Sequence, residues 1–268
     1  MGKYLLTCMG CALMFCIFLL PVQPQELHAG NDELGYPVDR VEHARSESLW
    51  SARMYELYTH RDYEQYPPFS QALNFTDIDY PLLHAALFYE SNRARVSEGL
   101  DALPWNINLE ITAYNHSLFM VESYEFAHYS GDSRRRSPNN RGSLAGITNP
   151  QVTENIAINF ALDYEEGRKF YVHDVDLYSY DNNPANSLKP LTYIGFAKNA
   201  VNLWMESFGH RKNLLSPNAV EMGAGAFFYR EANSGYFPKF RTTQNFQWWT
   251  PVIPGESRDP LPPGFRLE

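Results

Sequence analysis

The sequence has few cysteines, and all of them lie at its beginning. Cys8, Cys11 and Cys16 are the three cysteines among 268 residues. A protein cleaved after this segment retains no cysteine, so it can form no disulfide bond. An exported domain of this size without disulfides is more typical of bacteria than of animals.

The N-terminal segment itself predicts export. Lys3 supplies a short positive region, and residues 4–22 carry no charge. Pro21 and Pro24 break any helix, and Ala29 is a small residue suited to cleavage. We therefore expect residues 1–29 to be a signal peptide and the protein to be secreted, extracellular or periplasmic. The alternative is a retained membrane anchor, because about 20 uncharged residues suffice to span a bilayer.

Positive charge is also scarce. Twenty-two Lys and Arg residues face 31 Asp and Glu residues, which gives a net charge of −9. Non-specific nucleic-acid binding needs a positive surface that neutralises phosphates, so this composition argues against a nucleic-acid partner. A hydrophobic content of 44% with 20% charged residues predicts a folded chain with a sizeable core.

Residue patterns divide the chain into an extension, one domain and a tail. We expect residues 30–79 to form an extension with a short helix over 47–58, and residues 80–250 to form the domain. Residues 161–192 read as a long insertion rich in Tyr and Asp, of a length that is usually functional or disordered. Residues 251–268 are rich in proline and are expected to be irregular.

Three helices are predicted within the domain. The first is capped by Asp79, has Pro81 in its first turn and ends at Gly99. The second covers about 108–124, where the small Ala113 and Ser117 on one face allow another element to approach closely.

The third predicted helix begins near Thr192 and carries an apolar stripe that runs to Trp204 and Phe208. Gly209 is expected to adopt a left-handed conformation and end this helix. His210 is then the first side chain beyond the helix end, free to point into a cleft.

Alternation of residue types predicts three strands. In "TENIAINF" the side chains of Glu154, Ile156, Ile158 and Phe160 have the same parity and point to one side. "VEMGAGAFFYR" and "KFRTTQNFQWW" flank the turn "EANSG" and predict a hairpin.

These segments, in this order, resemble the CAP superfamily, also called SCP-like or cysteine-rich secretory protein/antigen 5/pathogenesis-related-1. The matching stretches are "NRARVSEGLDALPWNINLEITAYNHSLFM", "FAHYS", "ENIA", "WMESFGHRKNLL", "MGAGAFF" and "TQNF". The short "GHRKNLL" form is similar to bacterial members. The resemblance implies an α+β fold, a three-layer α-β-α sandwich with a small antiparallel sheet and a central cleft.

The resemblance also implies candidate site residues. In the family two histidines and two acidic residues often line the cleft, and His128, His210 and Glu154 match three of them. Glu206 is the candidate for the second acid, although Ser207 occupies the position where the eukaryotic pattern places its glutamate. On a helical wheel Glu206 points nearly opposite to the Trp204 stripe.

Two imidazoles and a carboxylate are a plausible ligand set for Zn²⁺ or another divalent cation. We therefore expect a binding module whose cleft takes a divalent metal through His128 and His210, with Glu154. A separate groove for a lipid or another hydrophobic ligand is what parts of the family imply. The alternatives are a metal-dependent, peptidase-like hydrolase that uses the same cleft and an envelope interaction module in which the polar cluster only supports the fold.

The enzyme hypothesis is the weaker one, because no G-x-S-x-G or HExxH motif is present. By sequence neighbourhood, Ser130 and Ser207 are the candidate nucleophiles. His116 shares the buried face of its helix and reads as a core histidine, whereas His84 and His173 have no partner that the sequence identifies.

Overall fold

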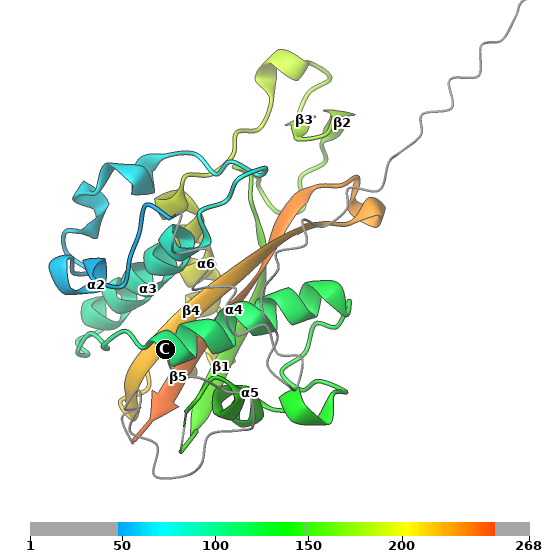
Figure 1. Cartoon of the computed structure of the whole chain (residues 1–268). Coiled ribbons are helices and arrows are strands. Elements are labelled where there is room, and N and C mark those ends of the chain that lie inside the picture. Colours follow the sequence, from blue (N-terminus) through cyan, green and yellow to red (C-terminus); the bar gives the residue numbers. More distant parts are fainter. Residues whose placement is uncertain (1–47, 148, 250–268) are drawn as a thin grey trace, which may run out of the picture.

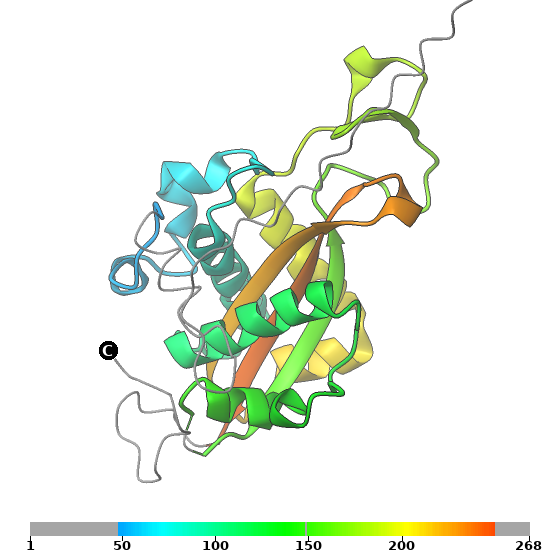
Figure 2. The ribbon, with the colours of Figure 1, turned by 45° about the vertical axis from the view of Figure 1, so that its right-hand side comes forward.

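The computed structural model describes residues 48–147 and 149–249. The predicted signal peptide with its three cysteines, and the proline-rich tail, lie outside the described residues. The centre of the molecule is an antiparallel sheet of β1 (Val152–Phe160), β5 (Pro238–Trp248) and β4 (Ala219–Arg230), in the order β1-β5-β4. Helices cover both faces of this sheet (Figures 1 and 2).

The two helical layers have different packing. The helices α3 (Tyr80–Ser97), α6 (Tyr193–Glu206) and α7 (Phe208–Leu214) lie on one side, and α4 (Ile107–Glu122) and α5 (Pro138–Leu144) lie on the other. Aromatic and aliphatic side chains of α3, α6 and the sheet form the main hydrophobic core. The predicted three-layer α-β-α sandwich is confirmed.

Glycines let α4 lie directly on the sheet. A Cβ atom at Gly225 would come within 2.2 Å of the backbone nitrogen of Tyr114, and one at Gly223 equally close to that of Glu110. Side chains larger than hydrogen are therefore excluded at both positions of β4. The predicted close approach at Ser117 is present, because its hydroxyl donates to the carbonyl of Gly225 at 3.3 Å.

The ends of the first domain helix are as predicted. The Asp79 side chain accepts a hydrogen bond from the backbone N–H of Leu82, and Pro81 lies in the first turn, where no N–H is required. Gly99 follows the helix with a φ of +81°, the left-handed conformation that favours glycine.

The predicted role of Gly209 is wrong. The helix α6 ends because Ser207 has an extended backbone, with φ −87° and ψ 121°, and a second short helix begins at Phe208. Gly209 therefore lies inside α7, and Phe208 is 88% exposed rather than part of the buried stripe. Trp204 is fully buried, as predicted.

The residues before the domain cover the outer side of α3. They form α2 (Met54–Leu57) and two 3₁₀ helices, Tyr63–Gln65 and Pro67–Ser70. Trp50 is 1% exposed and packs against aromatic rings of the same segment and of α3. This arrangement explains why α3 is buried on nearly every side.

The insertion at 161–192 is folded. It contains the hairpin β2 (Tyr171–Asp174) and β3 (Leu177–Ser179) and a 3₁₀ helix, Pro184–Asn186, and it projects from one end of the sheet (Figure 1). Leu162, Tyr178, Leu188 and Phe237 anchor it in a small core of its own.

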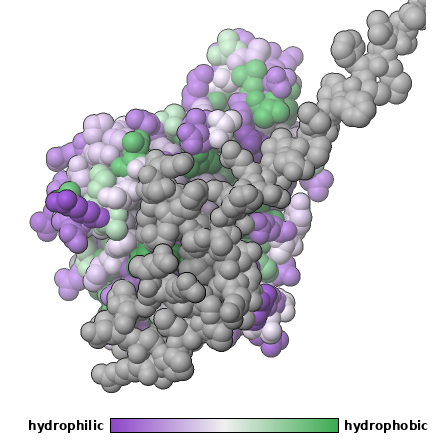
Figure 3. Space-filling view, in the orientation of Figure 1, coloured by the Kyte–Doolittle hydropathy of each residue, from purple (hydrophilic) through white to green (hydrophobic). Residues whose placement is uncertain are grey.

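The surface of this hairpin shows a small hydrophobic patch, where Val172 and Val175 are more than half exposed (Figure 3). The loop between β4 and β5 contains the 3₁₀ helix Ala232–Ser234. Within residues 48–147 and 149–249, no helix combines the length and the apolar character needed to cross a membrane.

Candidate functional site

Glu154 is the centre of a buried charged cluster. It lies on β1, an edge strand, and its side chain faces the layer of α4 and α5. One carboxylate oxygen, Oε2, accepts a hydrogen bond from Arg141 at 2.7 Å. The other, Oε1, lies 3.0 Å from Nδ1 of His128 and 3.6 Å from Nε2 of His116. The carboxylate is thus surrounded by one guanidinium and two imidazoles, although its side chain is only 1% exposed.

Arg141 links this carboxylate to the loop that follows α4. Its helix, α5, begins with a capping box between Ser137 and Asn140, which fixes the first turn. From there the guanidinium donates to the backbone carbonyls of Arg135 at 2.8 Å and His128 at 3.1 Å, as well as to Glu154. Arg141 therefore positions the main chain of His128, while Glu154 positions its ring.

The pKa values in the cluster follow from burial and from Arg141. Burial by itself would raise the pKa of Glu154, but the neighbouring His116 and Arg141 and the hydrogen bonds to the carboxylate outweigh it, so the pKa is lowered. Burial lowers the pKa of His116 to about 4. His116 is therefore neutral at pH 7, and Arg141 is the group that keeps Glu154 ionised there.

His128 presents one ring nitrogen outward. Its side chain is 42% exposed, and its Nδ1 contacts the buried carboxylate. An ionised carboxylate only accepts hydrogen bonds, so the proton of neutral His128 lies on Nδ1 and leaves Nε2 with a free lone pair. This pairing of a carboxylate with a histidine is the arrangement that orients histidines as metal ligands in proteins.

His210 approaches the same end of β1 from α7. Asn155, the next residue after Glu154, donates to the backbone carbonyl of His210 at 3.0 Å. Asn213, one turn further along α7, donates to the backbone carbonyl of Glu154 at 3.3 Å. These amide contacts hold α7 against the edge strand, which explains how residues far apart in the sequence meet.

The environment of His210 favours the neutral ring. Burial and the nearby charge of His128 both lower its pKa. Its Nδ1 is buried and has no hydrogen-bond partner in the part of the chain that the structure describes. At neutral pH the ring of His210, between α7 and the loop after α4, is therefore uncharged.

The predicted site residues fall into two groups. His128, Glu154 and His210 lie together at this end of β1. Glu206 is exposed at the last position of α6, and within residues 48–147 and 149–249 no ion pair or hydrogen bond joins it to the other three. The hydroxyl oxygen of Ser130 accepts a hydrogen bond from the backbone N–H of Asp132. Ser207 lies directly before α7.

Sequence reasoning missed two members of the cluster. Arg141 lies in the loop-like run "RRRSPNNRG", where nothing distinguishes it from exposed arginines. His116 was placed correctly on the buried face of its helix, but its contact with Glu154 depends on tertiary structure. His84 and His173, for which the sequence identified no partner, bond outside this cluster: His84 contacts Glu110 of α4 at 3.2 Å, and His173 contacts Ser179 at 2.7 Å.

The donor set at the cleft is small. Among the described residues, no three His, Cys, Asp or Glu side chains are gathered in a way that could hold a metal ion. Both oxygens of Glu154 are already engaged, one by Arg141 and one by His128. A metal ion at this place would therefore have only the imidazoles of His128 and His210 as protein ligands, with Glu154 orienting the first of them.

Comparison with known proteins identifies the family. The model of the cysteine-rich secretory protein family (CAP) matches residues 88–246. Among solved structures, the chain is similar to an extracellular SCP-domain protein from Bacillus anthracis, with 21% identity and a TM-score of 0.44 over 67% of this chain and 45% of that one. No curated protein matches the chain.

Two further solved structures are similar. One is an outer surface protein from Borrelia burgdorferi, with 12% identity and a TM-score of 0.40 over 67% of this chain and 98% of that one. The other is a cysteine-rich secretory protein from Staphylococcus aureus, with 16% identity and a TM-score of 0.37 over 63% and 39%. The chain thus spans less than half of the Bacillus and Staphylococcus proteins.

Proposed function

Because the chain belongs to the cysteine-rich secretory protein (CAP) family, we propose that it is an exported binding protein whose cleft takes a divalent cation through His128 and His210. The observation that carries the proposal is the hydrogen bond between His128 and the buried Glu154. It directs the free lone pair of a half-exposed imidazole toward a site that a second, neutral imidazole adjoins.

The carboxylate of Glu154 orients His128, the proposed metal ligand, and does not bind the ion itself. Arg141 compensates the buried charge of Glu154, and Glu154 in turn fixes the tautomer and orientation of His128. Two protein nitrogens leave the other coordination positions of a bound ion to water or to an oxygen of a further ligand, so we expect modest affinity.

Zinc titration by calorimetry tests this proposal. We expect about one Zn²⁺ per wild-type protein, loss of that binding in the variant His128→Ala/His210→Ala, and a roughly 10-fold weaker site in Glu154→Gln, because removal of an orienting carboxylate costs metal affinity of this order. His173→Ala, in the hairpin β2–β3, is the matched control and should bind as wild type does.

Two results would contradict the proposal. If wild-type protein binds no zinc, the cluster serves the fold or an organic ligand. If the double variant binds as wild type does, the ion lies elsewhere, for example on His173 and the acidic insertion. Circular dichroism of each variant establishes that the fold is retained. Incubation of the same proteins with peptide and ester pools, with and without chelator, tests the hydrolase alternative.

A further inference from the structure

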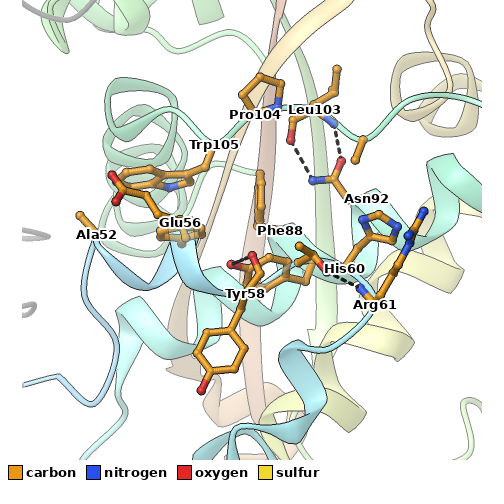
Figure 4. Close-up of a pocket in the computed structure, with 14 residues that line it drawn as sticks. Ala52, Glu56, Tyr58, His60, Arg61, Phe88, Asn92, Leu103, Pro104 and Trp105 are labelled. Atoms are coloured by element: carbon orange, nitrogen blue, oxygen red, sulfur yellow. Dashed lines mark hydrogen bonds between the residues drawn. The ribbon is translucent and has the colours of Figure 1, made fainter.

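A pocket of about 540 Å³ lies between the N-terminal segment and the connector that joins α3 to α4 (Figure 4). It shares no residue with the cleft of His128, Glu154 and His210. Part of its wall comes from residues 52–61, which precede the matched family segment 88–246. A cavity of several hundred Å³ is of the size that encloses a small organic ligand.

Hydrogen bonds within the protein hold the walls of the pocket in place. The side-chain amide of Asn92 on α3 donates to the carbonyl of Leu103 at 2.9 Å and accepts from its N–H at 2.8 Å. This double hydrogen bond holds the connector over α3. On the opposite wall the hydroxyl of Tyr89 donates to the backbone carbonyl of Tyr58 at 3.2 Å, which ties the N-terminal segment to the same helix.

The interior offers apolar surface to a planar group. Phe88, Leu103, Pro104 and Trp105 line it, and Trp105 is stacked on Tyr55 with ring centroids 4.2 Å apart and planes 9° apart. Figure 4 shows Ala52 and Trp105 on one side of the pocket, His60 and Arg61 on the other, and Phe88 between them. Glu56 lies on the side of Ala52 and Trp105, so the pocket is apolar in the middle, with a carboxylate at one end and a guanidinium at the other.

The end of the pocket formed by His60 and Arg61 has polar groups without protein partners in the described part of the chain. Nε2 of His60 is buried and has no hydrogen-bond partner among residues 48–147 and 149–249. No ion pair of the Arg61 guanidinium is present in that same part of the chain. Arg93 lies close by, because its Nη2 donates to the backbone carbonyl of His60 at 3.3 Å. Burial, Arg61 and Arg93 lower the pKa of His60, and the nearby Asp62 opposes them only in part.

We propose that this pocket binds a small organic anion with a planar apolar body. The body packs against Phe88 and Leu103, and the anionic group accepts hydrogen bonds from the Arg61 guanidinium, at the end of the pocket away from Glu56. At the Arg61 end an ammonium group fits less well, because Arg61 repels a cation and the stacked faces of Tyr55 and Trp105 are turned to one another.

Displacement of a fluorescent anion tests the proposal. Anilinonaphthalene sulfonate serves as the reporter, and naphthoate competes against naphthamide, a neutral compound of nearly the same shape. We expect naphthoate to bind wild-type protein at least about 5-fold more tightly than naphthamide, the factor that an interaction of about 1 kcal/mol provides.

Three variants separate the pocket from the rest of the surface. Arg61→Gln should weaken naphthoate binding about 5-fold and leave naphthamide unchanged. Ala102→Trp, at an exposed lining position, should fill the pocket and abolish both. Arg53→Gln, an exposed neighbour outside the lining, and the cleft variant His128→Ala/His210→Ala should bind as wild type does.

Several results would overturn the proposal. Equal affinity for naphthoate and naphthamide would remove the role of charge, and tighter binding of a trimethylammonium analogue would reverse it. Equal effects of Arg61→Gln and Arg53→Gln would show only general electrostatics. Unchanged binding in Ala102→Trp would place the probe outside this pocket. Thermal unfolding of each variant establishes that the fold is intact, so a loss of binding reports on the pocket.

Discussion

His116 is a buried histidine whose protonation opposes folding. Its Nε2 donates to the backbone carbonyl of Ala127 at 3.1 Å, and its Nδ1 has no partner within the described residues. A second proton would therefore have to enter a buried site beside Arg141, which explains the lowered pKa of about 4. The histidine is compatible with the fold only when it is neutral.

This lowered pKa predicts how stability depends on pH. The unfolded chain binds a proton at His116 below about pH 6.5, whereas the folded protein binds it only near pH 4, so stability is lost as pH falls through this window. Between about pH 7 and pH 5 the loss from this residue is on the order of 2 kcal/mol.

His116→Gln should remove that contribution, because its amide can donate to Ala127 and does not titrate. Urea unfolding at the two pH values gives the comparison, with His173→Gln as the control. A variant whose stability falls as steeply as that of wild type would show that His116 is not the group responsible. The pKa of Glu154 is lowered too, so its contribution to stability is present above the unfolded value of about 4.3 and is lost as pH falls below that value.

The candidate site was only partly predictable at the level of single residues. His128, Glu154 and His210 were found because each lies in a short motif that resembles a known family. Arg141 was not found, because its role depends on three acceptors brought together by tertiary structure: a carboxylate on β1 and two carbonyls of the preceding loop. A sequence pattern records none of these distances.

At the scale of elements, the contact of α4 with β4 depends on the absence of side chains. Gly225 has an ordinary backbone conformation. Glycine is required there because a Cβ atom would collide with the backbone of α4. Gly225→Ala should push α4 away from the sheet and lower the free energy of unfolding by roughly 1–3 kcal/mol, the range for overpacked interiors.

Gly209→Ala is the matched control. A Cβ atom there meets nothing within 4 Å, and the residue lies inside α7. We expect it to stabilise the protein by up to about 1 kcal/mol, since alanine favours a helix over glycine. The free energies of unfolding of both variants, measured by chemical denaturation, test this difference. Equal effects of the two substitutions would contradict the packing assigned to Gly225.

The different outcomes at these glycines show where the sequence reasoning ended. The three strands of the central sheet and the starts of α3, α4 and α6 were predictable, because alternation, Asp79 and Pro81 act locally. The end of α6 was not, because a glycine three residues after a helix can belong to its termination or to the first turn of the next helix. Here Ser207 adopts the extended conformation, and Gly209 continues into α7.

At the scale of the whole molecule, the N-terminal segment and the family domain share one core. Trp50 is buried by Tyr55 and Phe69 of its own segment and by Tyr89 of α3. The other side of α3 packs on the sheet through Leu82, Leu83 and Ala86, which belong to the same hydrophobic cluster. The hydrophobic core is continuous across the two parts, so we expect them to unfold together.

Trp50→Ala tests this cooperativity. Loss of the buried ring should lower the free energy of unfolding by about 3–5 kcal/mol, and Leu57→Ala, at a position 63% exposed, should change it by no more than about 0.5 kcal/mol. Hydrogen exchange of the β5 amides is the measurement that reports on the distant sheet. If the parts are cooperative, Trp50→Ala accelerates exchange in β5 as much as it lowers global stability. Unchanged exchange in β5 would show that the N-terminal segment unfolds separately and that the sheet with its helices is stable without it.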